Sequence, residues 1–151
     1  MTDAPAQPDA AIEVPDLEIR IFLQKGSFIA GDEPMFLLRQ RAIDGLWEFP
    51  GGILKRGSHF TQACQECLED DHGITDVNRA TGLRAVQTMI DDGSTTDHTV
   101  SLPFLIADFD GEPVVASPEF IGVGWFRSHQ FPTRLTHATR MLLQQLPKNR
   151  V

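Results

Sequence analysis

Three carboxylates, Glu66, Asp70 and Asp71, lie close together in a stretch of the chain that has no Lys or Arg between residues 59 and 72. Carboxylate oxygens are hard ligands that Mg²⁺ prefers, and the ion usually takes one or two of them together with phosphate oxygens of a substrate. Like charges at helical spacing cost a helix about a few tenths of a kcal/mol. Either a bound cation offsets this cost or the residues form a solvated acidic face, and the Gly51-Gly52 turn upstream favours the cation.

Residues 59–72 are predicted to form the helix that carries these carboxylates. At about 100° per residue, its apolar side chains share one sector that would pack on a sheet. The residues of this sector are Phe60, Ala63, Cys64, Cys67 and Leu68. Asp71 falls in the middle of the same sector, with Asp70 at its margin and Glu66 one turn before Asp70. The helix is therefore expected to place its carboxylates along or beside its buried face.

Both ends of this helix carry residues typical of helix ends. The Ser58 hydroxyl could accept a hydrogen bond from a first-turn N–H, so Ser58 is the expected N-cap. Gly73 suits the left-handed residue that closes a helix.

The rest of the chain alternates strand patterns with turns and ends in a second helix. Strands are expected at residues 17–23, 35–41, 46–49, 85–90, 99–109 and 120–126. Pro103, inside one of them, indicates a bulge or a sheet edge. A core stripe predicts a helix over residues 134–146, through Leu135, Ala138, Leu142 and Leu146. Strands with two interposed helices predict an α/β/α sandwich around a mixed sheet.

Length and charge limit the partners of the chain. Its 151 residues fit a single domain over residues 16–151, after an Ala-, Pro- and Asp-rich tail at residues 1–15 that we expect to be disordered and that has no secretory-signal pattern. With 21 acidic and 13 basic residues the formal charge is −8, which disfavours nucleic acid polymers and anionic membranes. A small anion that arrives with divalent cations is not excluded.

No apolar run is long enough for a membrane span, so we expect a cytoplasmic protein.

The two cysteines, Cys64 and Cys67, form one C-x-x-C. With no second pair, a four-cysteine zinc site is excluded. Redox pairs of this spacing lie at helix starts, whereas these thiols fall mid-helix on the apolar sector. Buried thiols in a reducing compartment are therefore the expected state, and a thiol-based sensor is the alternative.

Residues 50–74, with the Trp47-Glu48-Phe49 lead-in, resemble the signature box of the Nudix (MutT-like) hydrolases. In that family five residues separate the second glycine from a glutamate, and seven more precede an Arg-Glu-apolar-x-Glu-Glu-x-Gly-apolar stretch. Without gaps, the box positions that agree are Gly52, Leu68, Gly73 and Ile74. Asp70 and Asp71 take the two positions of metal-binding glutamates. The resemblance extends in outline over residues 17–146 and implies the Nudix fold.

The resemblance implies hydrolysis of a nucleoside diphosphate linked to another moiety, by attack of metal-activated water on the diphosphate. Mg²⁺ or Mn²⁺ would be the cofactor, held by the Gly51 carbonyl, Asp70 and Asp71. The expected catalytic residues are Asp70, Asp71, Glu66 and Glu119. The expected substrate-binding residues are Arg39, Arg41 and Gly52. Outside such a site, Glu119 would be an ordinary loop residue and the two arginines surface charges on a strand.

The chain departs from the family pattern at three charged positions. Ser58 and Cys67 stand where the family has glutamates, and Glu66 stands where it has an arginine. A metal-dependent pyrophosphohydrolase, weakened by these losses, and an inactive Nudix-fold module that binds a nucleotide or a protein both remain open. A shifted reading with Glu66, Glu69 and Asp70 as ligands would require the helix to turn by about 100°. The sequence leaves the oligomeric state open, a homodimer included.

Overall fold

The computed structural model describes residues 16–27, 29, 31–91 and 96–146, so the predicted tail at residues 1–15 lies outside the described residues. The strands are β1 (Asp16–Lys25), β2 (Met35–Arg41), β3 (Trp47–Glu48), β4 (Gly51–Ile53), β5 (Thr75–Asn78), β6 (Thr81–Gly82), β7 (Val86–Asp91), β8 (Thr96–Ile106), β9 (Asp108–Asp110) and β10 (Phe120–Arg127). The helices are α2 (Phe60–His72) and α3 (His137–Leu142), with 3₁₀ turns η1 (Ser128–Gln130) and η2 (Leu143–Gln145).

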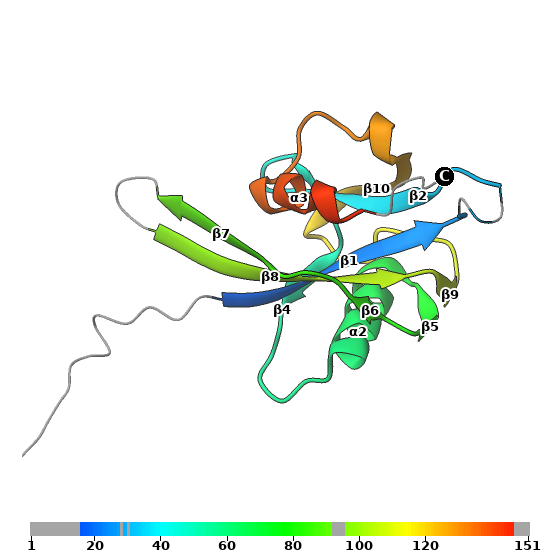
Figure 1. The fold of residues 1–151 in the computed structure, drawn as a ribbon, viewed down its shortest axis with the longest axis horizontal. Helices are drawn as coiled ribbons and strands as arrows, with labels where there is room; N and C mark the ends of the chain where they lie inside the picture. The colour runs from blue at the N-terminus through cyan, green and yellow to red at the C-terminus, as the bar shows by residue number, and fades with distance from the viewer. Residues whose placement is uncertain (1–15, 28, 30, 92–95, 147–151) are drawn as a thin grey trace, which may run out of the picture.

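Strand β1 is the centre of a mixed eight-stranded sheet. It runs parallel to β8, and it pairs antiparallel with β4 near its start and with β2 near its end. Strand β10 pairs with β2, while β6 and β7 pair with β8. Helix α2 lies on one side of β1 and β8 and α3 on the other (Figure 1). The predicted mixed sheet and α/β/α sandwich are confirmed.

Alternation along β1 divides the core into two clusters. Ile19, Ile21 and Leu23 pack with Cys64 and Leu68 of α2. Phe22, between them in the sequence, faces the other way, into a cluster with Phe36, Phe49, Leu135 and Leu142 on the side of α3. Since successive strand residues point to opposite faces, one strand supplies both halves of the core. The sandwich follows directly from this pattern.

Strand β1 changes its partner from β4 to β2 along its length, and the glycine turn contacts β1 where this change occurs. Between its pairing with β4 and its pairing with β2, the Ile21 N–H donates to the Pro50 carbonyl at 2.8 Å. Gly51 then lies so close to β1 that a Cβ atom there would overlap the Ile19 carbonyl oxygen. Gly52, one residue on, has open space at the corresponding position. The close backbone approach therefore requires glycine at residue 51 and not at residue 52.

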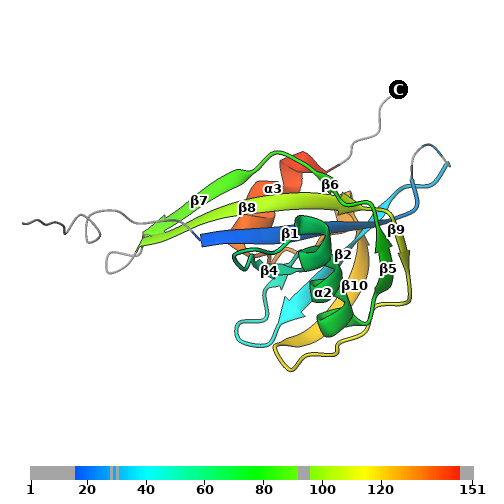
Figure 2. The same ribbon diagram turned by 90° about the horizontal axis from the view of Figure 1, so that it is seen from below.

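Backbone hydrogen bonds fix the C-terminal end of α2, the helix that lies in front of the sheet in Figure 2. Gly73 adopts the predicted left-handed conformation, with φ of 68°. The last carbonyls of a helix lack partners within it, and here Asp71 and His72 accept from the N–H groups of Ala116 and Val114 at 2.9 and 3.0 Å. This contact holds the segment before β10 against α2. It is how Glu119 and Phe120 come to lie beside the helix.

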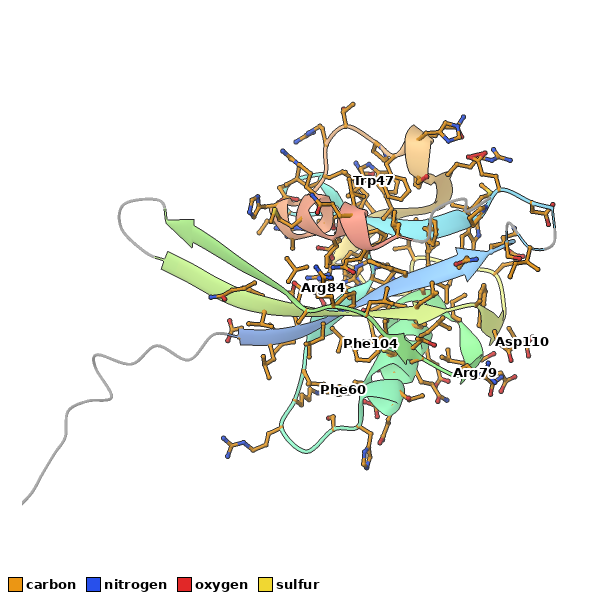
Figure 3. All side chains as sticks on the ribbon, in the orientation of Figure 1. Trp47, Phe60, Arg79, Arg84, Phe104 and Asp110 are labelled. Carbon is orange, nitrogen blue, oxygen red and sulfur yellow. The ribbon has the colours of Figure 1, made fainter. Side chains whose placement is uncertain are left out.

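The start of α2 differs from the prediction. His59, in an extended conformation, is the N-cap residue and makes no side-chain capping bond, so the assignment of Ser58 as N-cap is wrong. Ser58 instead ends a turn in which its N–H donates to the Lys55 carbonyl. Of the predicted apolar sector, Cys64 and Leu68 are buried, whereas Phe60 is 47% exposed. Phe60 lies over Phe104, with ring centroids 5.2 Å apart (Figure 3).

Other element bounds also differ from the predictions. The predicted strand at residues 46–49 is reduced to β3, because Pro50 has no N–H to continue a ladder. The predicted strand at residues 99–109 is divided into β8 and β9. Pro103 lies where the partner of β8 changes from β7 to β6. The second helix is shorter than predicted because Thr136 caps it, accepting from Thr139 N–H.

We expect Gly51→Ala to destabilise the protein by about 3 kcal/mol or more, because the added methyl must displace the backbone of β1. Gly52→Ala should change the free energy of unfolding by less than about 0.5 kcal/mol. Urea unfolding of both variants measures the difference. Equal effects of the two substitutions would contradict the proposed close approach at Gly51.

Candidate functional site

A cleft of about 390 Å³ opens between α2, β4 and the start of β10. Its acidic side chains come from the helix and from the segment that the helix end holds in place. They are Glu66, Asp70, Asp71 and Glu119. Of the described lining residues, Lys55 alone is basic. The cleft therefore carries an excess of negative charge at neutral pH.

The backbone of the Gly51-Gly52 turn forms the wall opposite α2. The sequence predicted that Glu66, Asp70 and Asp71 share this side of the helix, and all three line the cleft. Glu69 is exposed and does not line it, so the ungapped box describes the structure and the shifted reading does not. Ser58 also lines the cleft, from the loop before the helix.

Arg39, on β2, lies behind the cleft and is only 4% exposed. The register of the sheet places it directly opposite Glu48 of β3. Facing residues on neighbouring strands are close enough to interact, and here Arg39 Nε donates to Glu48 Oε2 at 2.8 Å. The Phe120 ring covers the guanidinium, with its centroid 3.9 Å from Cζ. The cation is thus held between a carboxylate and an aromatic face.

The remaining donors of Arg39 point at the cleft. Nη2 donates to the Gly51 carbonyl at 2.8 Å, and Nη1 donates to Asp71 Oδ2 at 3.2 Å. Nη1 also lies 3.4 Å from His72 Nε2. One buried guanidinium therefore joins β3, the glycine turn and the end of α2. It explains why an aspartate is tolerated in the middle of the helix's buried sector.

A second arginine, Arg20, extends the ion pair of Arg39 and Glu48 into a row of alternating positive and negative charges. Arg20 lies 3.5 Å from Glu48 and makes two hydrogen bonds to Glu18, at 2.9 and 3.0 Å. Burial opposes ionisation of Glu18, but hydrogen bonds and charge from Arg20 outweigh it, so the pKa of Glu18 is lowered. Burial likewise opposes the charge on Arg20, but attraction to Glu48 and Glu18 raises its pKa. Both groups stay charged where an unpaired charge would be costly.

His72 is fully buried beside this network. Its Nδ1 lies 3.0 Å from the Val114 carbonyl, and its ring lies against Phe120. A neutral ring with the proton on Nδ1 donates to Val114 and leaves Nε2 to accept from Arg39. Burial, together with the nearby Arg39 charge, lowers the pKa of His72 despite the Val114 contact. His72 therefore supports the position of Arg39 as a neutral group.

The cysteine at the box position of a glutamate is a protonated thiol. Cys67 Sγ lies 3.5 Å from the Gly51 carbonyl and 3.8 Å from Asp71 Oδ2. Burial raises its pKa to about 11, and Asp71 adds to this although Arg39 opposes it. Burial and the neighbouring Cys67 raise the pKa of Cys64 to about 12. Cys64 is buried as expected, while Cys67 is half-buried at the cleft.

The residues of the cleft differ in how well they fit a divalent cation. The Gly51 carbonyl and Asp71 already bind a guanidinium, and a protonated thiol is a poor ligand for Mg²⁺. This inner part does not fit the ion as it stands, and the assignment of Gly51 and Asp71 as ligands stays a prediction. Glu66, Asp70 and Glu119 line the outer part, and none of the described residues forms an ion pair with them. Mg²⁺ needs only one or two carboxylates when a substrate supplies phosphate oxygens.

Among the described residues, no group of three or more His, Cys, Asp and Glu side chains is arranged to hold a metal ion. The outer carboxylates therefore suit an ion that arrives with its own ligands.

A second cavity of about 560 Å³ adjoins the cleft and shares Glu119 and Phe120 with it. Its other lining residues are Arg20, Arg41, Ala42, Ile43 and Glu48. Arg41 has an exposed side-chain fraction of 36% and pairs with Asp44 at 2.7 Å. The two arginines predicted to bind substrate thus have different positions. Arg41 can be reached from a cavity, whereas Arg39 is enclosed.

The structure brings the predicted residues Gly51, Gly52, Glu66, Asp70, Asp71 and Glu119 to one cleft and places Arg39 and Arg41 behind and beside it. The sequence analysis missed Glu48, His72, Phe120 and Lys55. Glu48 gave one available signal, because a carboxylate between apolar Trp47 and Phe49 is expected to have a buried partner. Nothing comparable marks Lys55 or Phe120.

In the described part of the chain, no helix combines the length and the apolar character that crossing a membrane requires.

The sequence and the fold are similar to those of known proteins. Residues 25–146 match the family model of the NUDIX domain. The MutT NUDIX hydrolase from Burkholderia pseudomallei is 31% identical, with a TM-score of 0.74 over 89% of this chain and 100% of that one. The NUDIX domain of Shewanella oneidensis NrtR, complexed with ADP ribose, is 20% identical, with a TM-score of 0.66 over 93% and 90%. The MutT protein from Bacillus halodurans is 17% identical, with a TM-score of 0.66 over 85% and 80%. No curated protein matches the sequence.

We expect both thiols to resist alkylation in the native state. With a pKa of about 11, Cys67 holds far less thiolate at pH 8 than a free thiol with its pKa near 8.5, so iodoacetamide should react on the order of 100-fold more slowly than in urea. The native rate should rise about tenfold per pH unit from pH 7 to 9. Cys67→Ser assigns the remaining reaction to Cys64. A native rate that levels off between pH 6 and 8 would mean an activated thiolate and would favour the thiol sensor.

Proposed function

The chain belongs to the Nudix family, and from this premise we propose that it hydrolyses a nucleoside diphosphate linked to another moiety, with the diphosphate bound in the acidic cleft of α2. Hydrolases with the Nudix fold act on nucleoside diphosphate derivatives in general. The observation that carries the proposal for this chain is the gathering of Glu66, Asp70, Asp71 and Glu119 around one cleft beside the glycine turn.

The charge of the cleft supports a cation-bound substrate. Four carboxylates and one lysine line it, so a bare diphosphate would be repelled. A diphosphate that carries Mg²⁺ or Mn²⁺ brings positive charge to these carboxylates and fills the metal's other positions with its own oxygens. The cleft is therefore suited to the metal complex of a diphosphate rather than to the free anion.

The chain's residues would then have separate roles. Asp70 would hold the divalent ion together with phosphate oxygens of the substrate. When bound, the ion neutralises the phosphates and lowers the pKa of a coordinated water. Glu66 or Glu119 would accept the proton of the attacking water, since Asp71 is paired with Arg39. Lys55 and the backbone of Gly52 would contact the phosphates.

The adjoining cavity offers room for one end of such a substrate. It shares Glu119 and Phe120 with the cleft, so one extended molecule can occupy both. Arg41 lies there with a partly exposed guanidinium, and Phe120 and Ile43 add apolar surface. ADP ribose, with which the NrtR domain is complexed, has this chemical form, because a diphosphate joins a nucleoside to a ribose.

A second function is favoured by one specific observation. Arg39 already occupies the oxygens of Gly51 and Asp71, and Cys67 and Ser58 stand where the family has glutamates. If the outer carboxylates alone cannot activate water, the same cleft would bind a metal-bound nucleotide without turnover. The protein would then be a binding module of the same family.

We expect metal-dependent release of phosphate or nucleotide from a panel of nucleoside triphosphates, dinucleotide cofactors and nucleotide sugars, measured with Mg²⁺ and with Mn²⁺. Asp70→Asn should lower kcat/KM by about 10–100-fold, because it removes a charged ligand. Glu69→Gln is the matched control, since Glu69 neighbours Asp70 on the helix but is exposed and outside the cleft. Its activity should stay within about twofold of wild type.

Wild-type turnover unaffected by Asp70→Asn would contradict the placement of the ion. Saturable nucleotide binding without product, together with turnover in Cys67→Glu, would instead identify the binding module.

A further inference from the structure

Two oxygens from separate elements converge at the inner end of the cleft. The Gly51 carbonyl comes from β4, and the Asp71 carboxylate comes from the last turn of α2. Arg39 spans them, with Nη2 at 2.8 Å from the carbonyl and Nη1 at 3.2 Å from the carboxylate. The converging oxygens thus already share one cation, which the chain itself supplies.

We infer that the Arg39 guanidinium is the resident cation of the inner cleft, so that Gly51 and Asp71 are not ligands of a divalent metal ion. This inference deepens the proposed function, on which it rests for the metal-bound diphosphate in the outer cleft. A guanidinium stays charged at every pH at which proteins are folded. Its planar fork can satisfy a carbonyl and a carboxylate at once. The inner cleft is therefore charge-compensated before any ligand arrives.

The contacts of Arg39 oppose displacement of its side chain by a metal ion. Its Nε is anchored by Glu48 at 2.8 Å, and the Phe120 ring covers its face. Moving the side chain out would leave Glu48, itself 4% exposed, without its closest partner. Removing one member of a buried ion pair is strongly unfavourable. A metal ion that entered with Arg39 in place would meet a like charge.

The neutral thiol of Cys67 fits this arrangement. Cys67 Sγ lies near both oxygens that Arg39 binds. Arg39 is already balanced by Glu48 and Asp71. Another carboxylate at the position of Cys67 would add uncompensated negative charge to a half-buried place, whereas a protonated thiol adds none. A neutral residue at position 67 is therefore what the charge of Arg39 requires, since Glu48 and Asp71 already compensate it.

Titration with Mn²⁺ in the absence of nucleotide tests the inference, with the signal of free Mn²⁺ followed by electron paramagnetic resonance. Arg39→Met combined with Glu48→Gln removes both charges of the buried pair, so that neither is left unpaired. This double variant should bind Mn²⁺ at least about tenfold more tightly than wild type. The gain should disappear when Asp71→Asn is added. Circular dichroism establishes that each variant is folded.

Arg41→Met combined with Asp44→Asn is the matched control, because it also removes an arginine of β2 and a carboxylate paired with it, at 2.7 Å, without freeing Gly51 or Asp71. It should shift the Mn²⁺ affinity by less than about twofold. A gain equal to that of the double variant would overturn the inference, because general electrostatics would then explain both.

Asp71→Asn in the wild-type background tests whether Asp71 is a metal ligand, even if the double variant does not fold. We expect this substitution to change Mn²⁺ affinity by less than about twofold. A loss of tenfold or more would overturn the inference, since Asp71 would then be a metal ligand in the presence of Arg39. Because no nucleotide is used, this result is independent of whether the protein hydrolyses one.

Discussion

A single buried guanidinium holds together the parts of the protein that form the cleft. Arg39 lies on β2 and reaches Glu48 on the next strand, the Gly51 carbonyl in the glycine turn and Asp71 at the end of α2. An isolated buried charge is costly unless it is paired and hydrogen-bonded. The surrounding residues meet this constraint, because each supplies a carboxylate, a carbonyl or an aromatic face. The position of the cleft follows from how this charge is compensated.

The local parts of the fold could be predicted from the sequence. The α2 helix, its left-handed end at Gly73 and the burial of Cys64 and Leu68 follow from helical periodicity and backbone geometry. The same periodicity placed Asp70 and Asp71 on the side that now lines the cleft. Strand patterns with two interposed helices predicted the mixed sheet and the sandwich, and the resemblance of residues 50–74 to the family box implied the same fold.

The features that depend on contacts between distant residues could not be predicted in this way. Arg39 is enclosed because the register of β2 and β3 places it opposite Glu48, and because β10 brings Phe120 over it. The contact with Phe120 leaves no local sequence pattern, and Glu48 between Trp47 and Phe49 indicates a buried partner without identifying it as Arg39. Strands β4, β5 and β6 were missed because runs of two to four residues are too short to show alternation. Ser58 has the right chemistry for a cap, but the helix begins after His59.

The two parts of the cleft differ in how their charges are compensated. The inner cleft has its own cation, while the outer carboxylates Glu66, Asp70 and Glu119 have no partner of opposite charge among the described residues. Under the proposed function, this division would leave the outer cleft as the place for a metal-bound diphosphate. It also reduces the number of ligands that the protein can offer, and fewer ligands mean weaker positioning of an attacking water.

The location of a bound divalent cation tests most directly whether the Arg39 guanidinium is the resident cation of the inner cleft. Anomalous diffraction from crystals soaked in Mn²⁺ would show the ion beside the oxygens that bind it. We predict a peak at Asp70 or its neighbours Glu66 and Glu119, with Arg39 still bonded to the Gly51 carbonyl. A peak bonded to both Gly51 and Asp71, with the Arg39 side chain displaced, would contradict this role of the guanidinium.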